Sequence, residues 1–132
     1  MPDSAYSLTV KVGGVSKRTG ADKPIAWLHG ELKTPPMSRE ARIEAGVLLR
    51  RVQTGETLSM PESRPLPGLD PRCHELRIRD IEKKAEWRVI YYIGDLAIAV
   101  LDIFQKKTRS TPAGVLANCR RRLAAFKREE TP

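Results

Sequence analysis

The feature that most constrains the fold is a run of three predicted β-strands in the second half of the chain. Apolar and polar residues largely alternate over residues 74–79 and again over 87–92, which is typical of strands. A Gly-Asp pair at 94–95 predicts a hairpin turn, and the segment that follows, 96–104, is apolar at both odd and even positions. A strand of that kind is buried on both faces, so the sequence predicts a meander that is covered on each side.

Two helices are predicted to pack on this sheet. Ser38 is a favourable N-cap for a helix over residues 39–53, and Gly55 is placed to end it. The Thr111-Pro112 pair predicts the start of a basic C-terminal helix that reaches about Lys127. The expected inward faces are Ile43, Val47, Leu48 and Val52 in the first helix, and Val115, Cys119, Leu123 and Phe126 in the second.

The remaining segments complete a small α+β domain. Residues 24–28 are apolar and predict an N-terminal strand, which with the meander would form a small antiparallel sheet, and 29–33 allow one short helical turn. Prolines between 56 and 72 predict a segment without regular structure. The expected organisation is a flexible tail at 1–23, the domain at 24–128 and a short acidic tail at 129–132.

The composition fits one domain without a cofactor. A chain of 132 residues that is 40% apolar can bury enough surface to fold without a metal or a disulfide. Cys73 and Cys119 lack zinc-site spacing, so we expect reduced thiols in or near the core and no bound metal. The longest apolar run, 96–101, is far shorter than the roughly 20 residues of a membrane span. The expected compartment is the cytoplasm.

The positive charge is concentrated near the C-terminus. The chain carries a formal charge of +8, and residues 103–128 hold eight basic and no acidic side chains. A concentrated positive field attracts polyanions because neutralising phosphates releases counterions. The alternative is a solvated basic helix face with no partner.

The meander strands bring arginines together. Alternation places Arg77 and Arg79 on one face of the first strand and Arg88 on the same face of the next. A turn centred near residues 83–84 would put Arg79 opposite Arg88. Like charges side by side destabilise a sheet, so the pattern favours an anionic ligand. The alternative is that these arginines point into solvent with Glu75 or Glu86 as partners.

Several ordered motifs carry a family resemblance. They are PIAW at 24–27, LLRRVQTGE at 48–56, PLPGL at 65–69, ELRI at 75–78, WRVIY at 87–91, FQKKT at 104–108 and Thr111-Pro112. On these motifs the chain resembles the RelE/HigB toxin superfamily, most closely its phage-derived HigB-like branch, over about residues 23–126. The resemblance implies a RelE-like fold and a cytoplasmic type II toxin. Such a toxin cleaves mRNA in the ribosome and is held inactive by a helix-turn-helix antitoxin encoded beside it, as a hetero-oligomer.

The resemblance also implies functional residues. Those matched to its catalytic positions are Arg77, Arg88, either Lys106 or Lys107, and, at the aromatic position, Tyr91. Strand alternation, by contrast, places Tyr92 on the arginine face and Tyr91 on the other. The residues that we expect to contact RNA are Arg79, Tyr92, Arg120, Arg121 and Arg122.

These residue types suit RNA cleavage without a metal. The ribose 2′-hydroxyl attacks its own phosphate and gives a 2′,3′-cyclic phosphate and a 5′-hydroxyl, so the protein must stabilise a dianion and move two protons. Arginines stabilise the dianion, and a lysine among arginines has a lowered pKa and can transfer protons. His29 and His74 are alternative acid–base groups. The alternative function is a nuclease-inactive relative that only binds nucleic acid or its antitoxin.

Overall fold

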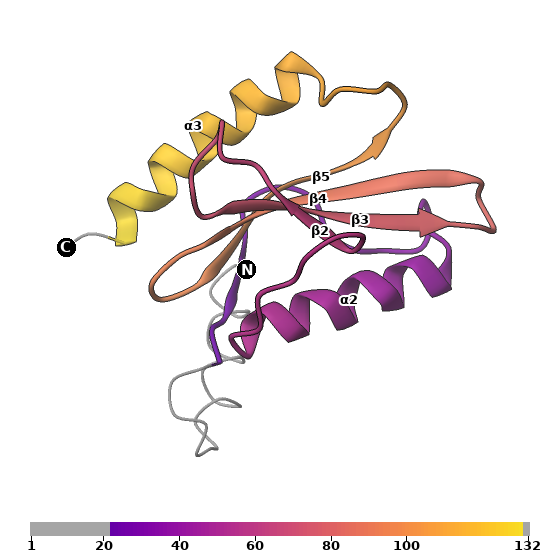
Figure 1. Cartoon of the computed structure of the whole chain (residues 1–132), viewed down its shortest axis with the longest axis horizontal. Helices are drawn as coiled ribbons and strands as arrows, with labels where there is room; N and C mark the ends of the chain where they lie inside the picture. The colour runs from indigo at the N-terminus through magenta and orange to yellow at the C-terminus, as the bar shows by residue number, and fades with distance from the viewer. Residues whose placement is uncertain (1–21, 131–132) are drawn as a thin grey trace.

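The computed structural model describes residues 22–130, which form a five-stranded mixed sheet with one helix on each face (Figure 1). The elements are β1 (Ile25–Trp27), α2 (Arg39–Gln53), β2 (Ser63–Pro65), β3 (Cys73–Asp80), β4 (Ala85–Ile93), β5 (Ile98–Lys106) and α3 (Ala113–Glu130). The strand order is β1-β5-β4-β3-β2. This arrangement confirms the α+β class and the meander. The predicted N-terminal tail lies almost entirely outside the described residues.

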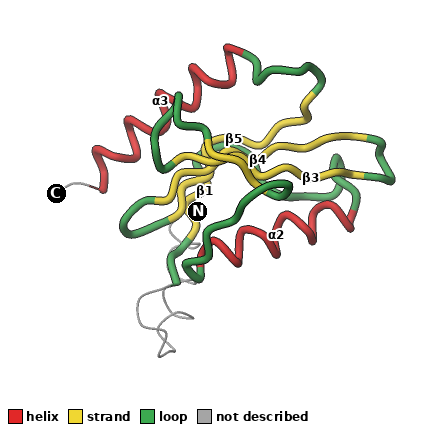
Figure 2. The backbone as a smooth tube through the Cα atoms, viewed as in Figure 1, coloured by secondary structure: helices red, strands yellow, loops and turns green. Residues whose placement is uncertain are grey.

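The sheet lies between α2 and α3 (Figure 2). It separates two apolar cores, one under each helix. Along β5, Ile98 and Val100 belong to the core under α2, whereas Ala99 and Leu101 belong to the core under α3. None of the four side chains is exposed to solvent. The prediction that the third meander strand is buried on both faces is therefore confirmed.

Three local predictions were wrong. The sheet is mixed rather than antiparallel because β1 pairs in parallel with β5. Parallel strands need a long connection, and the chain between β1 and β5 is long enough to provide one. The proline-rich segment contains β2, which lies at the edge of the sheet and ends at Pro65. Proline has no backbone N–H to donate, but at the edge of a sheet this costs no hydrogen bond between interior strands. No helical turn forms at 29–33, since Gly30 has a φ of 82°, outside the right-handed helical region.

Helix α2 begins and ends where the sequence predicts. The Ser38 hydroxyl accepts a hydrogen bond from the Ala41 N–H at 3.1 Å, and Gly55 adopts a φ of 98° after the last turn. The buried face differs from the prediction, because Ile43 and Val47 are exposed. The face against the sheet consists of Ala41, Ala45, Leu48, Leu49 and Val52.

The turn between β3 and β4 sets the register of the arginines. It spans residues 81–84, one residue earlier than predicted, so Arg77 lies directly opposite Arg88 and Arg79 lies opposite Glu86. The Asp80 carboxylate fixes this turn by accepting the Lys83 N–H at 3.0 Å. A shift of the turn centre by one residue moves each cross-strand partner by two.

The domain extends slightly beyond the limits predicted at both ends. Lys23, assigned to the tail, donates its N–H to the Gln53 carbonyl at 2.9 Å and its ammonium to the Gly94 carbonyl at 2.7 Å. Helix α3 continues to Glu130, whose carboxylate accepts the Leu96 N–H at 3.1 Å. Residues 129–130 are therefore part of the helix and not of an acidic tail.

Both cysteines are free thiols in the core under α3, as predicted. Burial raises the pKa of Cys73 and of Cys119 to about 12. A thiol with so high a pKa is a poor nucleophile, so these residues contribute to packing and not to chemistry.

Candidate nucleic-acid interface

Four basic side chains, one from each of four strands, lie on the sheet face that carries α3. They are Arg64 (β2), Arg77 (β3), Arg88 (β4) and Lys106 (β5). The register explains the grouping, because Arg64 lies opposite Glu75, Arg77 opposite Arg88 and Lys106 opposite Glu86. Directly opposed residues point to the same face of a sheet. We call these four cations, with Glu75 and Glu86, the basic cluster.

Glu75 is the buried centre of the basic cluster, with none of its side chain exposed. Its Oε1 accepts a hydrogen bond from Arg64 Nε at 2.9 Å, and its Oε2 lies 3.6 Å from Arg88 Nε. Arg88 is only 6% exposed and also lies 3.5 Å from Glu86. A buried charge needs such partners, so the carboxylates explain why the sheet tolerates adjacent arginines. Four cations against two carboxylates leave the basic cluster with a formal excess of positive charge.

Arg64, Arg77 and Lys106 are the half-buried members of the basic cluster and reach solvent. Partial burial lowers the pKa of Lys106, the charges of Arg88, Arg64 and Arg77 lower it further, and Glu75 opposes them. A lysine in this environment is easier to deprotonate than a free one, as proton transfer near neutral pH requires.

Phe104 adds an aromatic surface to the same face. It lies opposite Arg88 and two residues before Lys106 in β5, and it is partly exposed. An aromatic ring next to cations on a sheet can stack a nucleobase. Lys107 follows the strand and is exposed, so only Lys106 of the lysine pair belongs to the basic cluster.

Arg79 lies at the rim of the basic cluster, where it pairs with the carboxylate of Glu86. Its Nη1 bonds Glu86 Oε2 at 2.9 Å, with 68% of the arginine side chain exposed. Arg77 Nη1 turns toward the sulfur of Met60 at 3.3 Å, a weak acceptor that a phosphate oxygen would replace. The two arginines line a cleft of about 350 Å³ with Glu44, Pro61, Glu62 and Glu86. Burial and the charge of Glu62 raise the pKa of Glu44.

The structure brings neither tyrosine to the basic cluster. Tyr91 is 1% exposed on the opposite face of the sheet, as strand alternation predicted, with its hydroxyl 2.9 Å from Ser63 Oγ and its ring stacked on His74. Burial raises the pKa of Tyr91. Tyr92 faces α3 but is 5% exposed and packs edge-on against Phe126. Neither ring offers a surface to a base.

The three arginines of α3 differ in their surroundings. Arg120 and Arg121 are exposed, and Arg121 bonds the Asn118 side chain at 2.9 Å. Arg122 is half-buried and donates to the Leu101 carbonyl at 2.8 Å, next to Asp102 at 3.5 Å. Arg122 therefore ties α3 to β5, and the other two are available to a partner.

The histidines lie outside the basic cluster. His29 is 53% exposed, with its Nε2 3.9 Å from Asp102 Oδ1. His74 is half-buried on the α2 side, and burial lowers its pKa.

Sequence reasoning missed two residues of this face, Arg64 and Phe104. Arg64 was missed because no strand was expected among the prolines, and only the pairing of β2 with β3 reveals that it contacts Glu75. Phe104 belongs to the FQKKT motif, but the two-sided apolar run that it ends predicts a core side chain. Its place two residues before Lys106 on a strand was the available signal.

Fold and site together define a small basic α+β protein with clustered arginines and lysine on an open sheet face. A family model described as phage-derived protein Gp49-like (DUF891) matches residues 33–124, more than two thirds of the chain. The chain therefore belongs to the Gp49-like family, which is related to the RelE/HigB-like toxins. No curated protein matches the chain.

Two further features concern residues 22–130 as a whole. No helix in this range is long and apolar enough to cross a membrane. Nor do three or more His, Cys, Asp or Glu side chains in it gather as a possible metal site.

Proposed function

We propose that this protein is the toxin of a type II toxin–antitoxin pair, a ribosome-associated endoribonuclease that cleaves mRNA without a metal and so inhibits translation. The observation that carries the proposal is the basic cluster, in which four strands each contribute one cation to one face. Its excess positive charge suits an RNA backbone. Membership in the Gp49-like family supports the toxin class.

In the proposed reaction, Arg77 and Arg64 contact the scissile phosphate and stabilise the charge that develops on its oxygens. The neutral form of Lys106 accepts the proton of the ribose 2′-hydroxyl, whose oxygen attacks the adjacent phosphorus. The bond to the 5′-oxygen breaks, and that oxygen leaves with a proton from water. The products are a 2′,3′-cyclic phosphate and a 5′-hydroxyl. Arg88 is too deeply buried to touch RNA and acts as a positioning residue, through Glu75 and through the pKa of Lys106.

The partners follow from the distribution of exposed charge. Arg120 and Arg121 project from α3 and are suited to ribosomal RNA or to an acidic antitoxin surface. We expect a helix-turn-helix antitoxin encoded next to the toxin, a toxin–antitoxin hetero-oligomer, a cytoplasmic location and no membrane partner.

A second candidate is a nuclease-inactive member that only binds nucleic acid or the antitoxin. The burial of Arg88 favours it, because one of the residues matched to catalytic positions is already neutralised by Glu75 and Glu86. The two candidates differ in whether Lys106 is needed for more than binding.

The test is induced expression followed by mapping of message 5′ ends. Wild type should arrest growth and produce new 5′ ends, and co-expression of the neighbouring antitoxin should restore growth. A general base and a positioned donor each contribute about a hundredfold or more in rate, so Lys106→Gln, which removes the base, and Arg77→Gln, which removes a donor, should each remove both effects. Lys83→Gln, in the exposed β3–β4 turn, is the matched control and should remain toxic. Lys107→Gln tests the other lysine of the pair and should also remain toxic.

Normal growth with soluble full-length protein and intact messages would overturn the toxin proposal. Binding to ribosomes without new 5′ ends would establish the nuclease-inactive alternative. Equal activity of Lys106→Gln and wild type would remove the lysine from the reaction.

A further inference from the structure

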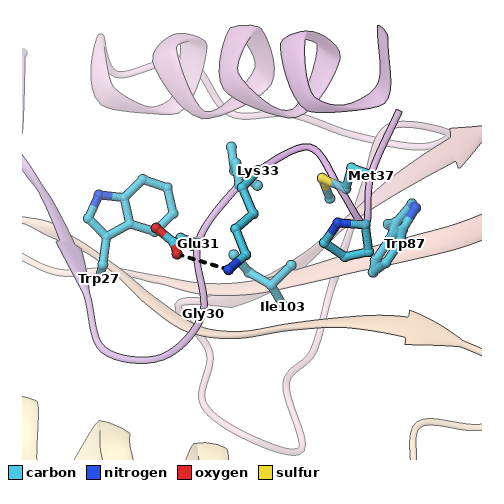
Figure 3. A pocket seen from close by; sticks show the side chains of 9 residues that line it. Trp27, Gly30, Glu31, Lys33, Met37, Trp87 and Ile103 are labelled. Carbon is cyan, nitrogen blue, oxygen red and sulfur yellow. Dashed lines mark ion pairs between the residues drawn. The ribbon is translucent and has the colours of Figure 1, made fainter. Parts of the chain in front are cut away.

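A pocket of about 720 Å³ lies on the sheet face that carries α2, opposite the basic cluster. Its walls are Trp27 at the end of β1, the loop from Gly30 to Met37, Trp87 of β4 and Ile103 of β5 (Figure 3). Its size is in the range of pockets that bind small ligands. We call it the two-tryptophan pocket, because both tryptophans of the chain line it.

The inner wall of this pocket is fixed. Trp87 is 7% exposed, and its indole Nε1 donates to the Asp80 carboxylate at 3.2 Å. Gly30 packs so closely on β5 that a Cβ there would lie 3.2 Å from Ile103 Cβ. Trp27, by contrast, is only half-buried, so part of its ring is open to a ligand.

One loose ion pair occupies the middle of the two-tryptophan pocket. Lys33 Nζ lies 3.4 Å from Glu31 Oε2, with 59% and 67% of the two side chains exposed. Figure 3 shows this pair between the two indoles. Exposed pairs of this kind are weak, so an anion can replace Glu31 as the partner of Lys33. The pocket thus combines an open aromatic ring with a cation that can be released.

The pocket and the basic cluster share one edge of the sheet. β1 ends at Trp27, opposite Val100, whereas β5 continues to Lys106. Ile103 faces the pocket and Lys106 faces the cluster, roughly 10 Å further along the strand at 3.3 Å per residue. A single strand of RNA on the cluster can therefore pass over this edge of β5 and reach the pocket within a few nucleotides.

We propose that the two-tryptophan pocket binds one nucleotide of single-stranded RNA, with the base stacked on Trp27 and the phosphate on Lys33. Base–aromatic stacking beside a cation is a common way to hold single strands, because every base presents a flat face. Glu31 competes with the phosphate for Lys33 and so weakens the site. The proposal rests on the proposed function in that the strand bound here is the one that the basic cluster cleaves.

Intrinsic fluorescence of the full chain reports directly on this pocket. The probe is a hexanucleotide with 2′-O-methyl groups, which the 2′-hydroxyl mechanism cannot cleave. Titration should quench tryptophan emission. For the Trp27 variants, binding is followed by the anisotropy of the same hexanucleotide carrying a fluorescein label. Trp27→Leu should weaken binding about five- to 150-fold, the range for loss of one stacked base, whereas Trp27→Phe should retain most of it.

The two charged residues should act in opposite directions. Lys33→Gln should weaken binding and lower the log–log salt slope by about 0.7, the value for one contact with a single strand. Glu31→Gln should tighten binding, since it frees Lys33. Both residues are exposed, so neither change should alter the fold.

Each alternative has its own result. Quenching by a nucleoside monophosphate as tight as by the hexanucleotide would overturn RNA in favour of a free nucleotide. If Trp27→Leu leaves RNA binding unchanged but abolishes neutralisation by the antitoxin, the pocket binds a protein partner and the RNA proposal is overturned. If messages are cleaved but no quenching occurs, the pocket proposal fails and the proposed function stands. If quenching occurs without any cleavage, the nuclease proposal fails alone.

Discussion

Replacing Arg88 with alanine tests whether a buried carboxylate holds the basic cluster together. Like-charge crowding alone would predict unchanged or slightly raised stability for Arg88→Ala. The structure predicts the opposite, because Arg88 is 6% exposed and its Nε lies 3.6 Å from the fully buried Glu75. Removing one partner of a buried ion pair costs about 3–5 kcal/mol. Arg64 still bonds the other oxygen of Glu75, so we expect a loss near the lower limit, about 3 kcal/mol.

The matched control is Arg77→Ala on the neighbouring strand. Arg77 is half-buried and its side chain bonds only a methionine sulfur among the contacts of the described residues, so the free energy of unfolding should change by about 0.5 kcal/mol or less. Urea unfolding followed by circular dichroism measures both variants. Arg88→Ala should lower the midpoint at unchanged m-value and reduce the melting temperature by about 10 °C.

A double variant separates the ion pair from simple loss of packing. Glu75→Gln with Arg88→Met leaves no unpaired buried charge and should recover much of the stability that Arg88→Ala loses. If Arg88→Ala instead unfolds at the same urea concentration as wild type and Arg77→Ala, then the Glu75–Arg88 pair does not stabilise the sheet. The buried carboxylate would then not be the reason that the sheet tolerates adjacent arginines.

Three further predictions concern other parts of the molecule. Burial alone would raise the pKa of Asp80, but hydrogen bonds from the Ser38 and Lys83 N–H groups and from Trp87 outweigh it and hold that pKa below its usual value. The stabilisation by the Asp80 carboxylate is therefore present above about pH 4 and lost as the pH falls through the lower folded pKa. Asp80→Asn should cost about 1–3 kcal/mol at pH 7. Urea titrations at several pH values should then show a smaller loss of stability in acid for Asp80→Asn than for wild type. Tyr91→Phe should cost about 1 kcal/mol by removing the hydrogen bond to Ser63 and should leave growth arrest intact. Loss of toxicity in a folded Tyr91→Phe variant would show that the Tyr91 hydroxyl takes part in the reaction. Arg120→Gln with Arg121→Gln should lower the log–log salt slope of ribosome co-sedimentation by about one unit per lost contact, and an unchanged slope would exclude α3 from RNA binding.

The elements predicted well from sequence are those whose pattern is repeated along one segment. Alternation over β3 and β4, the two-sided apolar run of β5 and the Ser38 cap of α2 are all local signals, and each element formed. The register was wrong because the turn centre depends on one side chain, Asp80, that binds the Lys83 N–H. A bond of that kind leaves no periodic trace in the sequence.

One part of the candidate site, the shared face of two arginines, was predicted for the same reason. Strand parity was enough to place Arg77 and Arg88 on one face. The role of Arg64 depends on β2, a strand of three residues that exists only through its pairing with β3. The two-tryptophan pocket depends on the path of the loop after β1, which Gly30 and its contact with Ile103 determine. Tertiary contacts of this kind are not visible in a single sequence.

The basic cluster has a weaker positive electrostatic field than four unpaired cations would have, but its side chains are held in a fixed arrangement. Glu75 and Glu86 cancel part of the positive charge that would attract RNA, but without them the arginines would repel one another and turn into solvent. A donor that is already in place costs no reorganisation when charge develops on the substrate, and this matters more for reaction than for binding. The unpaired charge that attracts RNA from a distance is therefore best carried elsewhere, on side chains whose exact placement is unimportant. The exposed Arg120 and Arg121 of α3 meet this requirement, which is why we assign attraction to the helix and chemistry to the sheet.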